Sequence, residues 1–74
     1  MTLDLRGLSF VESFEQIRIA IELSGFSKGE IVAFIEPHEN EKCRLLKLFA
    51  ESVLDCKPIL EEANGLYILK IMSS

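Results

Sequence analysis

Five consecutive apolar residues at positions 31–35 (Ile-Val-Ala-Phe-Ile) constrain the fold of this 74-residue chain more than any other stretch. A turn-like segment, residues 27–30, precedes them, and Glu36-Pro37 follows. A continuous apolar run between turn signals is typical of a strand that is buried on both faces. We therefore expect residues 31–35 to form a central strand of one small domain, residues 1–74.

A strand, a turn and a helix are predicted ahead of this run. Residues 2–6 fit a short strand, and Gly7 permits a tight backbone turn. Two capping boxes compete for the helix start, one at Ser9 with Glu12 and one at Ser13. The first is favoured because it aligns apolar side chains on one helical face. These are Phe10, Phe14, Ile17 and Ile21. The helix should end at Ser24-Gly25, with Phe26 packed back on its last turn.

A second helix is predicted over residues 40–54, with Asn40 as its N-cap. Its inward face should hold Leu46, Phe49, Ala50 and Val53. The remaining elements are a connector at 55–58, a strand at 59–62, a hairpin turn at Asn64-Gly65 and a last strand at 66–72. The order βαβαββ with right-handed crossovers places both helices on one face of a four-stranded mixed sheet. The fold class is α+β, a two-layer sandwich.

The first turn contains an ordered set of residues, namely Leu3, Asp4, Arg6, Gly7 and Leu8. It resembles the N-terminal signature of the TusA/SirA-like sulfur-carrier family, Leu-Asp-x-Arg-Gly-Leu-x-Cys-Pro-x-Pro. Weaker matches follow in order along nearly the whole chain, at Gly29-Glu30, Glu36-Pro37 and Asn64-Gly65. The resemblance implies a sheet order of 1-2-4-3, with the fourth strand antiparallel to the others.

The positions that carry the family's chemistry differ in this chain. Phe10 stands where the sulfur-carrying cysteine would be, and Val11 and Ser13 stand where the two prolines would be. In the family that thiol lies at a helix N-terminus, whose N–H groups and dipole stabilise an anion. Phenylalanine has no nucleophile, so no catalytic residue is expected at this turn. The binding candidates that remain there are Arg6, Gly7, Leu8, Phe10 and Glu12.

Two cysteines, Cys43 and Cys56, are the only other candidates for sulfur chemistry. A helix over 40–54 would separate them by about 15–20 Å, too far for a disulfide or a shared metal site. Each fits a buried small hydrophobe or a free thiol, so a sulfur carrier that uses Cys43 or Cys56 is an alternative. His38 is the only histidine and lacks a ligand pattern around it. We therefore expect no metal and no cofactor.

The charge balance and the apolar runs limit the partners. Twelve acidic and eight basic residues give a net charge of −4, which argues against nucleic acid. An RNA-binding module, like the similarly folded C-terminal domain of a translation initiation factor, is thus a second, disfavoured alternative. No apolar run is long enough to cross a membrane, and residues 1–20 lack a signal-peptide pattern. We expect a cytoplasmic protein.

One sheet face is predicted to lack a covering layer, because two helices cover only the other. The candidates for this open face are Val32, Phe34, Leu66, Ile68 and Lys70, although which alternating set of the last strand faces outward stays open. An exposed apolar face usually marks a partner or self-association site. The open face therefore predicts a non-catalytic protein-binding or regulatory module, with a homodimer through this face as one form of association, and the family resemblance implies a place in a sulfur-transfer pathway.

Overall fold

The computed structural model of the chain describes residues 1–24 and 30–73. The predicted helix end at Gly25 and the packing of Phe26 lie outside the described residues. The elements are β1 (Thr2–Asp4), α1 (Phe10–Ser24), β2 (Ile31–Ile35), the 3-10 turn η1 (Pro37–Glu39), α2 (Asn40–Ser52), β3 (Cys56–Ala63) and β4 (Leu66–Ser73).

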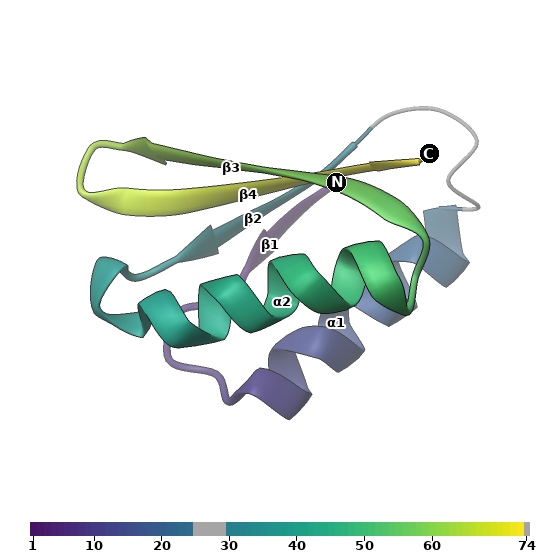
Figure 1. The fold of residues 1–74 in the computed structure, drawn as a ribbon, viewed down its shortest axis with the longest axis horizontal. Coiled ribbons are helices and arrows are strands. Elements are labelled where there is room, and N and C mark those ends of the chain that lie inside the picture. The colour runs from purple at the N-terminus through teal and green to yellow at the C-terminus, as the bar shows by residue number, and fades with distance from the viewer. Residues whose placement is uncertain (25–29, 74) are drawn as a thin grey trace.

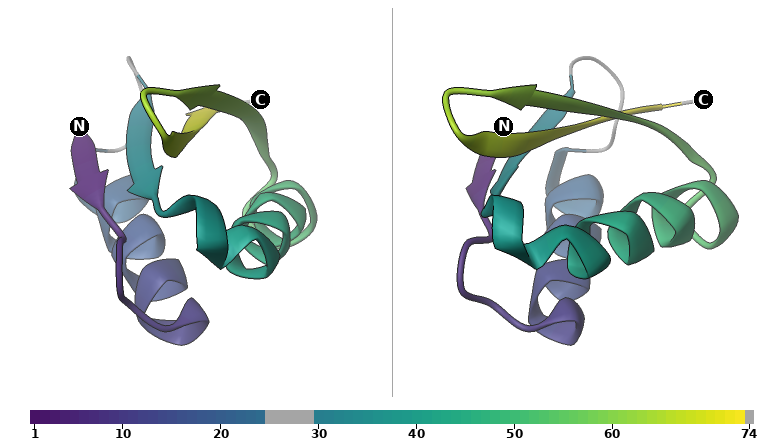
Figure 2. Two further views of the ribbon diagram at one scale, coloured as in Figure 1. Left: turned by 90° about the vertical axis from the view of Figure 1, so that its left-hand side faces the viewer. Right: turned by 60° about the vertical axis from the view of Figure 1, so that its left-hand side comes forward.

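The strands form one four-stranded sheet in the order β1-β2-β4-β3. β1 pairs with β2 in parallel, and β4 runs antiparallel to both β2 and β3. The sheet forms one layer, and α1 and α2 form the other, on the same side of it (Figures 1 and 2). The α+β fold and the strand order 1-2-4-3 predicted from the sequence are therefore confirmed.

The hydrophobic core fills the space between the two layers. Its largest fully buried aliphatic side chains are those of Leu5, Ile17, Ile31, Ile35, Leu46, Leu69 and Ile71. Burial alternates along β2, where Ile31, Ala33 and Ile35 face the helices while Val32 and Phe34 are only partly buried. The strand is central, because it has neighbours on both edges. The expectation of burial on both faces is wrong, because no described residue forms a layer over the second face.

Two predicted element starts are wrong. Asn40 is not an N-cap but the first residue of α2, because η1 precedes it directly. Glu36 begins this segment, and its N–H donates to Glu39 Oε1 at 3.2 Å. β3 begins at Cys56 rather than at Ile59, so residues 56–58 are not a connector. Pro58 is tolerated within β3 because this is an edge strand, where one side of the backbone is unpaired.

Two further boundaries differ by a few residues. β1 ends at Asp4 rather than at Arg6, which leaves Arg6 and Gly7 in the turn. Gly7 has a φ of 79°, a left-handed conformation that glycine adopts without a steric cost. α2 ends at Ser52, and Val53 is 58% exposed rather than on the inward face. Leu54 packs against the core instead.

Candidate functional site

The first turn, residues 5–9, links the end of β1 to the start of α1. The N–H of Leu5 donates to the carbonyl of Phe34 at 3.0 Å, which carries the β1–β2 pairing past the end of the strand. The capping box at Ser9 is present: Glu12 N donates to Ser9 Oγ at 3.1 Å, and Ser9 N donates to Glu12 Oε1 at 3.1 Å. The predicted start of α1 is therefore confirmed. The same capping box gives Glu12, one of the binding candidates, a structural role.

Lys42, the third residue of α2, holds the first turn in place. Its Nζ donates to the carbonyl oxygens of Leu5 and Leu8 at 2.7 and 2.8 Å, and to Glu39 Oε2 at 2.7 Å. The other oxygen of Glu39 accepts a hydrogen bond from the N–H of Gly7 at 3.4 Å. Both side chains are largely buried, at 9% and 14% exposure. The shape of the turn therefore depends on a charge pair between Glu39 of η1 and Lys42 of α2, two residues that are distant from the turn in sequence.

Electrostatics around the turn favour the charged forms of both acidic groups. Burial raises the pKa of Glu39, but the hydrogen bonds from Lys42, Gly7 and Glu36 outweigh it, so the net pKa lies below the ordinary value. The side-chain and backbone hydrogen bonds from Arg6 lower the pKa of Asp4 to about 2. Arg6 Nε lies 2.8 Å from Asp4 Oδ1, so this binding candidate is already engaged in an ion pair.

Phe10 belongs to an aromatic cluster between the two helices. Its ring centroid lies 6.0 Å from that of Phe14 and 5.0 Å from that of Phe49, the latter in an edge-to-face arrangement. Phe10 and Phe14 share one face of α1, as predicted, and Phe10 also packs against Phe49 of α2, although it is only half-buried. Ser13 is fully buried, and its N–H donates to the carbonyl of Ser9 at 2.9 Å. A proline at this position would lose that bond.

Neither cysteine has the surroundings of a reactive thiol. Cys43 in α2 is 1% exposed, and Cys56 at the start of β3 is 6% exposed. Burial raises the pKa of Cys43 by more than the nearby Lys42 and Lys47 lower it. Burial, with a contribution from Asp55, also raises the pKa of Cys56. A sulfur nucleophile needs an exposed thiol with a lowered pKa, and these two thiols have the opposite properties.

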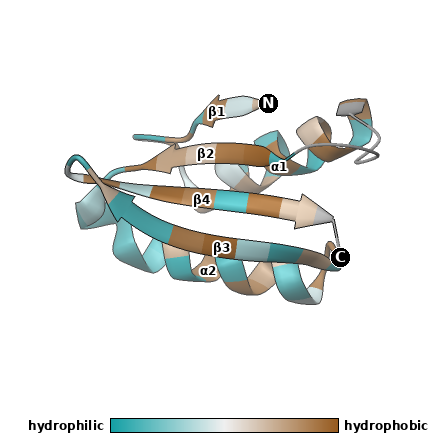
Figure 3. Cartoon of the chain, turned by 90° about the horizontal axis from the view of Figure 1, so that it is seen from above, coloured by the Kyte–Doolittle hydropathy of each residue, from teal (hydrophilic) through white to brown (hydrophobic). Residues whose placement is uncertain are grey.

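The sheet-face candidates lie together on the face opposite the helices. Val32 pairs with Lys70 and Phe34 with Ile68, and each of the four side chains is partly exposed. Leu66 shares this face because it lies two residues from Ile68 along β4. Figure 3 looks onto this side, where apolar segments extend across β2, β4 and the middle of β3.

Further residues that the prediction missed extend this open face. Ile59 and Glu61 of β3 pair with Lys70 and Ile68 and therefore lie on the same side, as does Met72. Ile59 is 44% exposed. Lys70 Nζ lies 2.8 Å from Glu61 Oε1, and this ion pair crosses the apolar surface. The alternation of the predicted strands at 59–62 and 66–72, paired in the register that the Asn64-Gly65 turn sets, could have revealed these residues.

No protein-family model, curated protein or solved structure matches the chain. Within residues 1–24 and 30–73 there is no group of three or more His, Cys, Asp or Glu side chains that could hold a metal ion. In the same part of the chain, no helix has both the length and the apolar character to cross a membrane.

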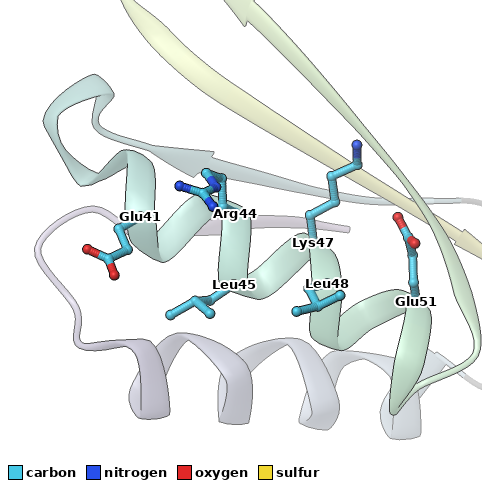
Figure 4. A pocket seen from close by; sticks show the side chains of 6 residues that line it. All are labelled: Glu41, Arg44, Leu45, Lys47, Leu48 and Glu51. Atoms are coloured by element: carbon cyan, nitrogen blue, oxygen red, sulfur yellow. The ribbon is translucent and has the colours of Figure 1, made fainter.

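A shallow groove of about 340 Å³ lies on the outer surface of α2. Its lining residues are Glu41, Arg44, Leu45, Lys47, Leu48 and Glu51. In Figure 4, Leu45 and Leu48 extend toward the side where α1 lies, whereas Lys47 and Glu51 extend toward the sheet. The groove is open, its charges are balanced, and it contains none of the predicted site residues. We assign no chemistry to it.

Proposed function

We propose that the chain is a non-catalytic protein-binding domain, similar to the TusA/SirA-like sulfur carriers but without their thiol, that acts in the cytoplasm as part of a sulfur-transfer assembly. The observation that carries this proposal is the open sheet face, with Val32, Phe34 and Ile68 partly exposed. Exposed apolar surface of this kind is typical of contact sites. The two free cysteines fit a reducing compartment.

The absence of a catalytic role is supported by the first turn. The family's thiol position is held by Phe10, whose ring packs on Phe14 and Phe49. Cys43 and Cys56 lie elsewhere and are buried, so a carrier function for either would require local opening. RNA binding is disfavoured by the net charge of −4.

The face is a better contact site than the free edge of the sheet. β3 forms that edge with eight residues, which include Lys57, Pro58, Glu61 and Glu62. Proline and charged side chains on an edge strand hinder the addition of a further strand. β1, at the other edge, has only three residues. Partner binding through side chains of the open face is therefore favoured over strand addition.

Two measurements test this proposal. The first is the intact mass of the protein after incubation with a cysteine desulfurase and cysteine. We expect no added sulfur. A gain of one sulfur that a Cys43→Ser or Cys56→Ser variant loses would revive the carrier alternative.

The second measurement probes the open face with the dye ANS, at protein concentrations of a few micromolar. We expect fluorescence that falls by at least about half in Ile68→Lys, because a charge in the centre of an apolar patch disrupts dye binding. Leu48→Lys, at a 53% exposed position of α2, is the matched control and should keep the wild-type signal. Equal signals from all three proteins would contradict the proposal.

A further inference from the structure

We infer that the occupant of the open face is a second copy of the chain, packed face to face about a two-fold axis so that Lys70 of each copy lies beside Glu61 of the other. This inference rests on the proposed function and identifies the partner that binds the open face. Three features carry it: the charge balance of the face, the position of the Lys70–Glu61 pair, and the size of the face.

The first feature is that the charged side chains of the paired strand residues on the open face balance one another, although the chain is acidic. The strand pairings place two acidic and two basic side chains on it, namely Asp4, Lys57, Glu61 and Lys70. The chain as a whole carries twelve acidic and eight basic residues, so the excess of four negative charges lies outside this set. Two copies therefore meet through these residues without an excess of like charge at the contact, whereas a strongly charged partner would find no complementary surface among them.

The second feature is the place of the ion pair within the apolar surface. Lys70 lies on β4 between Val32 of β2 and Ile59 of β3. Its side chain is 33% exposed, and that of Glu61 is 50% exposed. Covering this pair with an apolar partner would remove water from both charges at a cost. A second copy about a two-fold axis offers the same pair in reverse, so each lysine gains another carboxylate and each carboxylate another lysine.

The third feature is the area of the face. Strands about 4.8 Å apart with a rise of about 3.3 Å per residue give a four-stranded face of roughly 400 Å² in projection. Two such faces would bury on the order of 1,000 Å² of accessible surface, which is at the lower end for specific interfaces. We therefore expect a weak dimer with a dissociation constant on the order of 1–100 µM.

Sedimentation velocity from about 5 to about 500 µM tests the inference. The wild type should shift from monomer to dimer across this range, and Ile68→Lys should stay monomeric. Leu48→Lys on the outer surface of α2 is the control and should dimerise like the wild type. Circular dichroism of each variant, measured in parallel, shows that the fold is retained.

Charge reversal tests the reciprocal pairing directly. Lys70→Glu and Glu61→Lys should each weaken dimerisation by at least about tenfold, because like charges then meet across the axis. An equimolar mixture of the two variants should recover association, because both pairs between unlike copies are attractive again. A mixture that stays monomeric would overturn the proposed arrangement.

The remaining outcomes separate the inference from the proposed function. A wild type that is monomeric at every concentration overturns the second copy as the partner. If ANS fluorescence is still lost in Ile68→Lys, the face remains a binding surface and the proposed function stands. If ANS fluorescence is the same for the wild type and Ile68→Lys, both the inference and the proposed function fail. A dimer that Leu48→Lys abolishes and Ile68→Lys leaves intact would place the interface on the helices and overturn the inference.

Discussion

The ammonium group of Lys42 lies 2.7 Å from the carboxylate of Glu39, one helical turn earlier in the chain. The remaining hydrogen-bond donors of the lysine reach the carbonyl oxygens of Leu5 and Leu8. An ammonium group has three N–H donors, so all of its hydrogen-bonding capacity is used within the protein. This pair fastens the first turn to α2.

Replacing Lys42 with methionine is expected to lower the free energy of unfolding by about 2–4 kcal/mol. The substitution keeps the unbranched apolar part of the side chain but leaves the largely buried Glu39 carboxylate without its partner. Urea unfolding measures the loss. Arg18→Met is the matched control, because Arg18 forms ion pairs with Glu15 and Glu22 but is 40% exposed, and it should cost less than about 1 kcal/mol. Equal losses in the two variants would contradict the anchoring role of Lys42.

Stability is expected to fall on acidification partly through Glu39. Its pKa in the folded protein lies below the ordinary 4.5, so its stabilising contribution is present above that value. The contribution is lost as the pH falls through the lower, folded pKa. Urea unfolding between about pH 6 and pH 2.5 should therefore show a steeper decline for the wild type than for Glu39→Gln. Lys42→Met should also flatten the profile, and unchanged slopes in both variants would refute this assignment.

Truncation of Phe10 to alanine is expected to cost about 2–3 kcal/mol. This is less than the loss for a fully buried aromatic residue, because Phe10 is half-buried. Most of the loss should come from its ring contacts with Phe14 and Phe49. Val11→Ala, at a 68% exposed neighbouring position, should change the free energy of unfolding by less than about 0.5 kcal/mol. A loss below about 1 kcal/mol for Phe10 would show that its ring is a contact residue.

Ser13→Ala is expected to leave stability unchanged or raise it by up to about 1 kcal/mol. The side chain of Ser13 is fully buried, and its hydroxyl has no hydrogen-bond partner in the described part of the chain. Removing an unsatisfied buried hydroxyl removes its desolvation cost. Thermal and urea unfolding provide the comparison. A loss above about 1 kcal/mol would show that the hydroxyl has a stabilising partner, such as a bound water.

Both thiols are expected to react slowly with iodoacetamide in the folded protein. Burial raises the pKa of Cys43 and that of Cys56, and the thiolate is the reactive form. At about pH 7.5, labelling should be at least tenfold slower than in urea. Each of the single variants Cys43→Ser and Cys56→Ser retains one cysteine, so its labelling rate belongs to that remaining thiol. Rapid native labelling of either thiol would support the carrier alternative.

The fold was predictable because its signals are local. The apolar run at Ile31–Ile35, the capping box at Ser9 and the turn at Asn64-Gly65 each depend on residues close in sequence. The start of β3 was missed because residues 56–58 are held by pairing with β4, which their own sequence does not show. The start of α2 was missed because a 3-10 turn leads directly into the helix.

The sheet face was predictable in part, and the anchor of the first turn was not. Side chains alternate along a strand, so Val32, Phe34, Ile68 and Lys70 could be grouped before the open face was known. In contrast, nothing in the sequence distinguishes Lys42 from the other charged residues of an amphipathic helix. Its bond to Leu5 joins positions 37 residues apart, and no local pattern specifies such a contact. The spacing of Glu39 and Lys42 was the only signal in the sequence for this anchor.

The position of β4 sets the order in which this protein can fold as it leaves the ribosome. β4 follows β2 and β3 in the chain but lies between them in the sheet. Until β4 has been made, β2 has only the three-residue pairing with β1, and β3 has no strand to pair with. Leu69 and Ile71, two fully buried core residues, arrive with this last strand. The emerging chain should therefore stay open and vulnerable to proteolysis until β4 emerges, and then close in a single late step.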